Sequence, residues 1–202
     1  MLHVGLTGGL ASGKSFVGQE LEALGCFVIR MDDLGHQVLA PGGEAYSSVV
    51  AAFGPAILNP DATINRRALA AKVFGDAEEL RKLNGLTHPA IRARAKALAT
   101  GYAASHPGGI VVTEAAILIE TGSYQDFDCL VLAYCDTEQQ IERAMRRDGL
   151  SREDVMSRIG RQMPLEHKKR YADYVIDTSG TKESTREQTR ALFAALKQRL
   201  CN

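Results

Sequence analysis

The sequence predicts an α/β fold in which helices cover both faces of a parallel β-sheet. Short apolar runs alternate with helix-like stretches along the 202 residues, and this alternation is typical of parallel strands joined by crossover helices. The run at residues 26–31 is nearly all apolar, as expected of a strand buried on both faces. The first apolar run leads into a glycine-rich loop and then a helix-like stretch, which is the setting of a phosphate-binding loop.

Five strands account for the apolar runs, and helices follow most of them. The predicted strands are residues 3–7, 26–31, 109–113, 129–134 and 174–177. The predicted helices outside the middle of the chain are residues 14–24, 137–147, 151–163 and 182–200. Gly25 would end the first helix, and Asp136 or Thr137 would cap the second. Ser151 and Asp154 resemble a capping box for the third.

The middle of the chain, residues 33–105, is predicted to form several helices. Turn signals interrupt it at residues 41–43 (Pro-Gly-Gly), 54–55 (Gly-Pro) and 59–61 (Asn-Pro-Asp). The stretch at residues 77–104 is long and helical, and Pro89 inside it should start a new helix or kink this one.

The most specific motif is Gly-Gly-Leu-Ala-Ser-Gly-Lys-Ser at residues 8–15, which fits G-x-x-x-x-G-K-[ST]. Glycines let consecutive backbone N–H groups turn inward as an anion-binding nest, and the start of the next helix adds partial positive charge. Lys14 would reach the β- and γ-phosphates of a nucleotide, and the Ser15 hydroxyl would ligate Mg²⁺. The alternative is a glycine-rich turn that only precedes a helix, but strand, loop, lysine, hydroxyl and helix all fall in register.

Acidic residues near the ends of two predicted strands could serve phosphoryl transfer. Asp32 and Asp33 end the second strand, and ligands of open α/β sheets bind beyond the carboxyl ends of strands. One of the two could take or orient the proton of an acceptor hydroxyl; the alternative is the N-cap of a helix that starts near Leu34. Glu114 ends an apolar run and would hold Mg²⁺ through a water or order the loop, whereas the alternative is a solvated strand end. Glu120 is a weaker candidate, with a structural role or a place at the pocket rim.

Two arginine-bearing helices form a candidate lid. Arg143 and Arg147 are four residues apart and Arg158 and Arg161 are three apart, so each pair shares a helix face. Closing over a nucleotide, the lid could bring positive charge to the transition state. The alternative for each arginine is a surface charge or an ion pair within its helix. Arg143 and Arg147 are the stronger candidates.

Composition and charge exclude several classes of protein. Lys and Arg total 24 and Asp and Glu total 24, so the formal net charge is zero and argues against nucleic-acid binding. No apolar stretch approaches the roughly 20 residues of a membrane span, and the amino end lacks the pattern of a secretion signal. We therefore expect a cytoplasmic protein without membrane or nucleic-acid partners. We also expect a monomer or weak homo-oligomer, although composition and charge do not decide between these two states. The cysteines show no metal-binding spacing, and Cys26 and Cys129 fit as small buried hydrophobes. The chain has no Asn-Lys-x-Asp guanine motif, which argues against a GTP-dependent switch.

Together, the motifs resemble those of the dephospho-CoA kinase family over nearly the whole chain. The similar segments are residues 6–15 (LTGGLASGKS), 28–32 (VIRMD), 87–89 (THP), 114–120 (EAAILIE), 143–151 (RAMRRDGLS), 158–164 (RIGRQMP) and 172–180 (ADYVIDTSG). The chain departs from the family pattern at Ala11 (a glycine in the family), Arg30 (aspartate), Asp33 (apolar), His36 (often arginine), Ala116 (proline) and Thr178 (asparagine).

The resemblance implies a P-loop kinase-like three-layer sandwich with a parallel five-stranded sheet in the order 2-3-1-4-5. It implies one P-loop kinase domain spanning residues 1–202. Within it, the nucleotide-binding core would be residues 1–38, 105–142 and 171–202, a helical acceptor-binding insertion residues 39–104, and the lid residues 143–170.

The resemblance also implies a reaction: transfer of the γ-phosphoryl group from ATP, with Mg²⁺, to the 3′-hydroxyl of dephospho-CoA, giving coenzyme A and ADP. The implied catalytic residues are Asp32, Lys14, Arg143 and Arg147. The implied nucleotide-binding residues are Gly8, Gly9, Leu10, Ala11, Ser12, Gly13, Lys14, Ser15 and Phe16, with Ser15 as the metal ligand. The implied substrate-binding residues are Thr7, Asp32, His88 and Glu114. The alternative is another small-molecule P-loop kinase, acting on a nucleotide, shikimate or a sugar acid.

Overall fold

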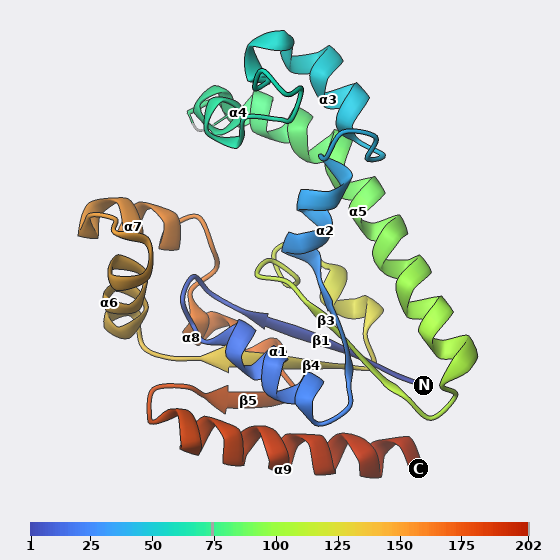
Figure 1. The fold of residues 1–202 in the computed structure, drawn as a ribbon. Helices are drawn as coiled ribbons and strands as arrows, with labels where there is room; N and C mark the ends of the chain where they lie inside the picture. The colour runs from blue at the N-terminus through green and yellow to red at the C-terminus, as the bar shows by residue number, and fades with distance from the viewer. Residues whose placement is uncertain (74, 202) are drawn as a thin grey trace. The chain divides into compact units, whose positions relative to one another are not determined.

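The computed structural model describes residues 1–73 and 75–201, and it contains a five-stranded sheet (Figure 1). The strands are β1 (Leu2–Gly8), β2 (Phe27–Arg30), β3 (Ile110–Glu114), β4 (Cys129–Tyr134) and β5 (Tyr174–Asp177). Their spatial order is β2-β3-β1-β4-β5. β1 pairs in parallel with β3 and β4, and β4 pairs in parallel with β5. The α/β fold and the strand order implied by the resemblance are confirmed.

Two helices cover one face of the sheet: α1 (Lys14–Ala23) and α9 (Lys182–Cys201), which lie next to each other (Figure 1). Side chains alternate between the faces of a strand, so Val4 and Leu6 of β1 point toward these helices and are fully buried. Leu21 of α1 and Leu196 of α9 pack into the same cluster. Burying such a side chain stabilises the fold by about 1.5–3 kcal/mol.

The opposite face of β1 carries smaller or polar residues. Gly5 must be a glycine there, because a Cβ atom would come within 2.8 Å of the Phe127 ring and 2.9 Å of the Leu130 side chain. The His3 ring packs edge-on against Phe127, with ring centroids 4.8 Å apart. The Thr7 hydroxyl donates to the Ala116 carbonyl oxygen over 3.2 Å. The segment that follows β3 therefore covers this face.

Contacts divide the chain into two compact units, the first made of residues 1–29 and 101 onward and the second of Arg30–Thr100. The second unit holds α2 (Met31–Val38), α3 (Tyr46–Phe53), the 3₁₀ turn Pro55–Ile57, α4 (Arg66–Val73) and most of α5 (Ala77–Ser105). Its core is a separate cluster that includes Val38, Val49, Phe53, Ile57 and Leu69. The helices predicted for residues 33–105 are confirmed.

A single helix, α5, runs through Pro89, so the alternative of a new helix at this residue is wrong. Proline removes one backbone hydrogen bond and costs roughly 3 kcal/mol inside a helix. Leu86, Ala90 and Ile91 around it pack against the core of the second unit, and this burial offsets the loss. None of the helices in residues 1–73 and 75–201 combines the length and apolar character needed to cross a membrane.

Three more helices belong to the first unit: α6 (Thr137–Asp148), α7 (Arg152–Ile159) and the short α8 (Leu165–Lys168). Asp136 caps α6 by accepting from the Gln139 amide over 2.8 Å, and Ser151 caps α7 by accepting from the Asp154 amide over 3.1 Å. Both predicted caps are confirmed. The predicted helix end at Met163 is wrong, because α7 stops where Gly160 follows it.

The junction of β2 and α2 differs from the prediction. β2 ends at Arg30 and α2 begins at Met31, so Asp32 and Asp33 lie in the first turn of a helix and not at the end of a strand. Arg30 occupies the N-cap position, and the prediction that an aspartate caps a helix near Leu34 is wrong. Both carboxylates are still favoured there by the positive end of the helix dipole.

Cys26, Cys129 and Cys135 are buried free thiols, as predicted for the first two. Burial raises the pKa of Cys26 and of Cys129 to about 11. Thiols of such high pKa carry little thiolate at neutral pH and are unreactive.

Candidate active site

The glycine-rich loop follows the carboxyl end of β1 and turns directly into α1. Gly13 has φ +84° and Ala11 has φ +52°, so two residues of the loop adopt the left-handed conformation. A non-glycine residue in this region is unusual and marks a conformation imposed by its surroundings. A Cβ atom on Gly8 would collide with the Ser12 hydroxyl and lie 3.0 Å from the Ala133 carbonyl oxygen. The sequence GGLASGKS is therefore fitted to one tight loop.

The loop leaves a row of backbone amides available to an anion. Among the described residues, no group accepts a hydrogen bond from the backbone N–H of Ala11, Gly13, Lys14 or Ser15. Gly13 and the first residues of α1 also carry the partial positive charge of a helix start. A nest of backbone donors at a helix start has the geometry that binds anions such as phosphate. The motif thus has the geometry that its sequence predicts.

Glu114, at the end of β3, holds two polar side chains of the motif, Lys14 and Ser15. Its Oε1 accepts from Lys14 Nζ over 2.7 Å and from the Ser15 hydroxyl over 2.8 Å. Lys14 and Glu114 are both buried, with exposed side-chain fractions of 9% and 4%. In the register of the sheet, Leu6 lies opposite Glu114, so the pairing of β1 with β3 brings the carboxylate to the loop. A strand-end glutamate exposed to solvent, the alternative considered from sequence, is wrong.

The donor set here fits Mg²⁺. The Ser15 hydroxyl and the Glu114 carboxylate supply oxygen atoms 2.8 Å apart, and Mg²⁺ prefers oxygen ligands while it keeps waters and substrate oxygens for its other positions. No group of three or more His, Cys, Asp or Glu residues that could form an all-protein metal cage exists in the described part of the chain. The site thus suits an ion that arrives with phosphate.

Thr178, which follows β5, fixes the middle of the loop. Its hydroxyl donates to the Ser12 carbonyl oxygen over 2.8 Å and to the Tyr134 carbonyl oxygen over 3.0 Å. Arg143 of α6 donates to the Thr178 carbonyl oxygen over 2.6 Å and to its hydroxyl over 3.2 Å. Gly13 passes so close that a Cβ atom on it would lie 3.0 Å from Thr178. Arg143, the loop and the end of β5 therefore form one packed unit.

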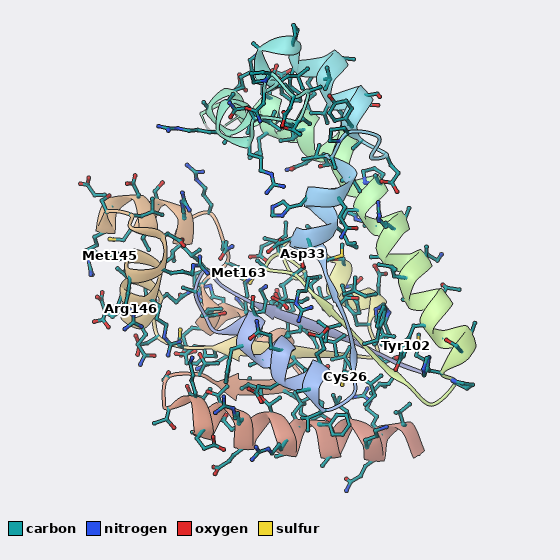
Figure 2. The ribbon with its side chains drawn as sticks, in the orientation of Figure 1. Cys26, Asp33, Tyr102, Met145, Arg146 and Met163 are labelled. Carbon is teal, nitrogen blue, oxygen red and sulfur yellow. The ribbon has the colours of Figure 1, made fainter. Side chains whose placement is uncertain are left out.

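Arg147 lies in the last turn of α6 and Arg158 in the last turn of α7. Arg161 follows the end of α7, so the prediction that it shares a helix face with Arg158 is wrong. Arg147 binds the Asp148 carboxylate with two hydrogen bonds, of 2.7 and 2.9 Å, and these bonds lower the pKa of Asp148, with a smaller effect from the Arg158 charge. Leu10 and Ala11 of the loop pack against the apolar cluster of α6 and α7, which includes Met145 (labelled in Figure 2). The loop and the candidate lid thus share a core.

Two glutamines hold the backbone of Leu10, and sequence reasoning did not assign either of them. Gln140 Nε2 donates to the Leu10 carbonyl oxygen over 2.7 Å, and Gln162 Oε1 accepts from the Leu10 amide over 3.0 Å. Gln162 lies in the Gln-Met-Pro segment that carried part of the resemblance, whereas no sequence signal singles out Gln140. Gly9 lies so close to Gln140 that a Cβ atom there would collide with the amide.

The other predicted residues are spread over both units. Thr7 lies beneath the loop, bonded to Ala116, and Phe16 on α1 contacts Arg186, whose guanidinium lies 5.4 Å from the ring centroid. Asp32 and His88 belong to the second unit, where burial and the Arg92 charge lower the pKa of His88. The structure brings together Lys14, Ser15 and Glu114, and it places Arg143 on Thr178, which contacts the same loop. The catalytic and binding roles of all the predicted site residues stay predictions.

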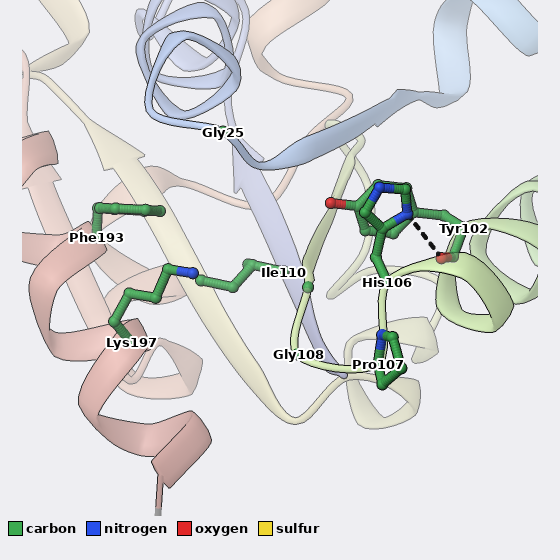
Figure 3. A pocket seen from close by; sticks show the side chains of 9 residues that line it. Gly25, Tyr102, His106, Pro107, Gly108, Ile110, Phe193 and Lys197 are labelled. Carbon is green, nitrogen blue, oxygen red and sulfur yellow. Dashed lines mark hydrogen bonds between the residues drawn. The ribbon is translucent and has the colours of Figure 1, made fainter.

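A shallow cavity lies elsewhere, by the amino end of β3 and the carboxyl-terminal part of α9 (Figure 3). It measures about 300 Å³ and is lined by Gly25, Tyr102, His106, Pro107, Gly108, Gly109, Ile110, Phe193 and Lys197. The Tyr102 ring stacks between Phe27 and His106 at its wall. None of its lining residues belongs to the phosphate-binding loop, so this cavity is not the predicted nucleotide site.

Comparisons with known proteins show to which family the chain belongs. A family model described as "CoaE: Dephospho-CoA kinase" matches residues 2–184. The dephospho-CoA kinase of Geobacter sulfurreducens is 43% identical over 192 residues, covering 95% of this chain and 96% of its own length. The chain belongs to the dephospho-CoA kinase family. It is an enzyme of the final step of coenzyme A biosynthesis.

Solved structures extend the comparison. The crystal structure of a Thermus thermophilus protein matches with a TM-score of 0.81 and 30% identity, covering 96% of this chain and 97% of that one. A shikimate kinase from Bacteroides thetaiotaomicron matches with a TM-score of 0.51 and 13% identity over 97% of this chain and 98% of its own. At that identity the second match shows the fold alone, which is P-loop kinase-like as predicted. As a P-loop kinase, the dephospho-CoA kinase family uses a nucleotide.

Proposed function

We propose that this dephospho-CoA kinase family member transfers the γ-phosphoryl group of ATP to the 3′-hydroxyl of the dephospho-CoA ribose. The hydroxyl loses its proton, a bond forms between the 3′-oxygen and the γ-phosphorus, and the bond from that phosphorus to the β,γ-bridging oxygen breaks. The products are coenzyme A and ADP. The observation that carries the proposal is the arrangement of Lys14, Ser15 and Glu114 beside the backbone amides of the loop.

In this proposal the loop supplies preorganised charge for the phosphates. The amides of Ala11, Gly13, Lys14 and Ser15 would bind phosphate oxygens, and Lys14 would exchange its bond to Glu114 for the β- and γ-phosphates. Fixed donors of this kind stabilise the charge of the transition state without reorganisation during the reaction. The remaining loop residues, from Gly8 to Phe16, would shape the site.

We propose that Ser15 holds Mg²⁺ and that Glu114 orders it, directly or through a water. When bound, the ion would neutralise phosphate charge. Because Glu114 Oε1 accepts hydrogen bonds from both Lys14 and Ser15, this carboxylate would also keep both side chains in place before the nucleotide binds.

The acceptor side of the proposal rests on the second unit. Asp32 would take or orient the proton of the 3′-hydroxyl, and His88, with Thr7 and Glu114, would contribute to substrate binding. Residues 39–104 would form the acceptor-binding insertion, and residues 143–170 the lid. Arg143 and Arg147 would place positive charge on the phosphates when the lid closes. The enzyme would work in the cytoplasm, on water-soluble anionic substrates, as a monomer or weak homo-oligomer.

The test is ADP release from Mg²⁺-ATP with four acceptors: dephospho-CoA, AMP, shikimate and gluconate. We expect turnover with dephospho-CoA to exceed that with each other acceptor by at least two orders of magnitude, because the recognition groups of the larger acceptor are missing from the smaller ones. Equal or faster turnover with shikimate, gluconate or AMP would contradict the proposal and indicate another P-loop kinase activity. Mass spectrometry of the product would place the new phosphate on the 3′-oxygen.

A further inference from the structure

Lys168, the last residue of α8, is the largest fully buried side chain among the described residues, with 0% of its side chain exposed. Its neighbour in sequence, Lys169, is exposed at 37% and pairs with Glu166 over 2.8 Å. A lysine is almost never buried without charged or polar partners. The contacts of Lys168 therefore indicate why its charge lies inside the protein.

Three oxygen atoms surround the Lys168 ammonium group. Nζ lies 2.7 Å from the Ala116 carbonyl oxygen, 2.8 Å from Glu120 Oε1 and 3.4 Å from the Gly8 carbonyl oxygen. An ammonium group has three N–H donors and no acceptor. The three oxygens account for all of them, so Lys168 has no donor to offer a phosphate in this arrangement. It can support the site but is not placed to act on the substrate.

The three partners come from parts of the chain that must stay together at the phosphate-binding loop. Gly8 is the first glycine of the loop, and Ala116 follows Glu114 by two residues. Glu120 also accepts from the backbone amide of Met163 over 3.0 Å, in the segment between α7 and α8 where Figure 2 labels Met163. One ammonium group thus joins the loop, the segment after β3 and the segment after the candidate lid.

We propose that Lys168 is a positioning residue for nucleotide binding, acting with Glu120 as its counter-ion. Its bond to the Gly8 carbonyl fixes the orientation of the peptide group that enters the loop, and its bond to the Ala116 carbonyl fixes the exit of the strand that carries Glu114. Lys168 thus fixes the backbone on both sides of the Lys14–Glu114 ion pair, at Gly8 and at Ala116. The inference rests on the proposed function only in treating the loop as the ATP site.

The deciding variant is Lys168→Met, which keeps the unbranched side chain and removes the donors and the charge. We expect the Kd for ATP, measured by calorimetry without acceptor, to rise about tenfold or more, and the KM for ATP to rise with it. The KM for dephospho-CoA should stay within about threefold of the wild-type value. Lys169→Met is the matched control, with an exposed ion pair and no contact to the loop, and its ATP affinity should not change.

A second variant separates positioning from general stability. Glu120→Gln keeps an acceptor for Lys168 and for the Met163 amide, so it should fold even if Lys168→Met does not, and it should weaken ATP binding about threefold. Thermal unfolding accompanies every affinity measurement. The proposal is overturned if folded Lys168→Met binds ATP with a Kd within twofold of the wild-type value. It is also overturned if the KM for ATP and the KM for dephospho-CoA rise by the same factor. If Lys168→Met fails to fold, unchanged ATP affinity in Glu120→Gln overturns it.

The binding measurement also keeps this proposal distinct from the reaction itself. If wild-type protein binds ATP but does not phosphorylate dephospho-CoA, the proposed function fails, while the ATP affinities of the variants still decide the role of Lys168. If both ATP binding and its dependence on Lys168 are present, the two proposals stand together.

Discussion

The Thr178 hydroxyl donates to the Ser12 carbonyl oxygen over 2.8 Å, a contact between residues 166 positions apart in the chain. It joins the residue after β5 to the middle of the phosphate-binding loop, and Arg143 binds the same threonine from α6. Thr178 is buried, with 4% exposed. A residue that departs from the family pattern therefore supports the loop directly.

Thr178→Val removes this hydroxyl at nearly constant volume. We expect the free energy of unfolding to fall by about 1–3 kcal/mol, because the Ser12 carbonyl loses its buried donor, whereas the Tyr134 carbonyl keeps the Thr178 backbone amide. We also expect a several-fold increase in the KM for ATP, because the Ser12 peptide group is no longer held. Urea unfolding and steady-state kinetics measure the two effects.

Thr189→Val is the matched control for that variant. Thr189 is also buried, but among the described residues its hydroxyl donates only to the Thr185 carbonyl within α9. It should lose stability without a change in the KM for ATP. A Thr178→Val enzyme whose KM for ATP matches that of Thr189→Val would contradict a role for Thr178 in the loop.

The loop and its strands could be predicted from sequence because their signals are local. Gly8 and Gly13 of GGLASGKS lie where the loop makes close contacts or turns left-handed, and the apolar runs of β4 and β5 mark those strands to the residue. The supports of the loop could not be predicted in this way. Gln140, Thr178 and Lys168 reach it from sequence separations of 130 to 166 residues, and their residue types alone indicate no partner.

The start of α2 shows a different limit. Residues 26–31 are all apolar except Arg30. Hydrophobic periodicity alone does not indicate where such a strand ends. The structure places the boundary at Arg30, and Met31 becomes the first helical residue without any capping side chain. A helix without a capping side chain offers no sequence signal for its first residue, and this is why the apolar run alone predicts Asp32 and Asp33 at the strand end.

Lys14→Ala should abolish the bond to Glu114 and the proposed contact with phosphate. We expect turnover to fall by a factor on the order of 10³ and ATP affinity to fall as well. The buried Glu114 carboxylate loses its counter-ion, so stability should drop by on the order of 3 kcal/mol. Adding Glu114→Gln should recover stability but not turnover.

Lys197→Ala serves as the control for Lys14→Ala, because Lys197 lines the cavity of Figure 3 and has no contact with the loop. Its turnover and ATP affinity should equal those of the wild type. Normal kinetics in Lys14→Ala would mean that the loop does not bind phosphate.

Asp32→Asn tests the proposed base. The amide cannot accept a proton, so turnover should fall by a factor on the order of 10² or more, while ATP binding measured without acceptor should be unchanged. Asp33→Asn is the matched control, one residue further in the same helical turn, and it should retain most of the activity. If Asp32→Asn keeps wild-type turnover, or Asp33→Asn loses as much, Asp32 is not the base.

Stability should fall as the pH is lowered from about 7 to 5, and His3 should contribute to that loss. Burial lowers the pKa of His3, opposed by the Asp128 and Asp126 charges, and its Nε2 lies 2.9 Å from the Thr113 hydroxyl. The folded protein therefore favours the neutral ring, whereas the unfolded chain takes up a proton near the ordinary pKa of about 6.5. Because the unfolded state binds more protons, stability decreases as the pH falls through that value toward the lower folded pKa.

His3→Gln removes the titrating ring and keeps a side-chain amide that can reach Thr113. The free energy of unfolding, measured in urea, should then decrease less between pH 7.5 and pH 5 than it does in the wild type. His88 has a lowered pKa for the same reason, so part of the pH dependence should remain. Equal pH dependence in His3→Gln and the wild type would mean that the His3 ring titrates alike in the folded and unfolded chains.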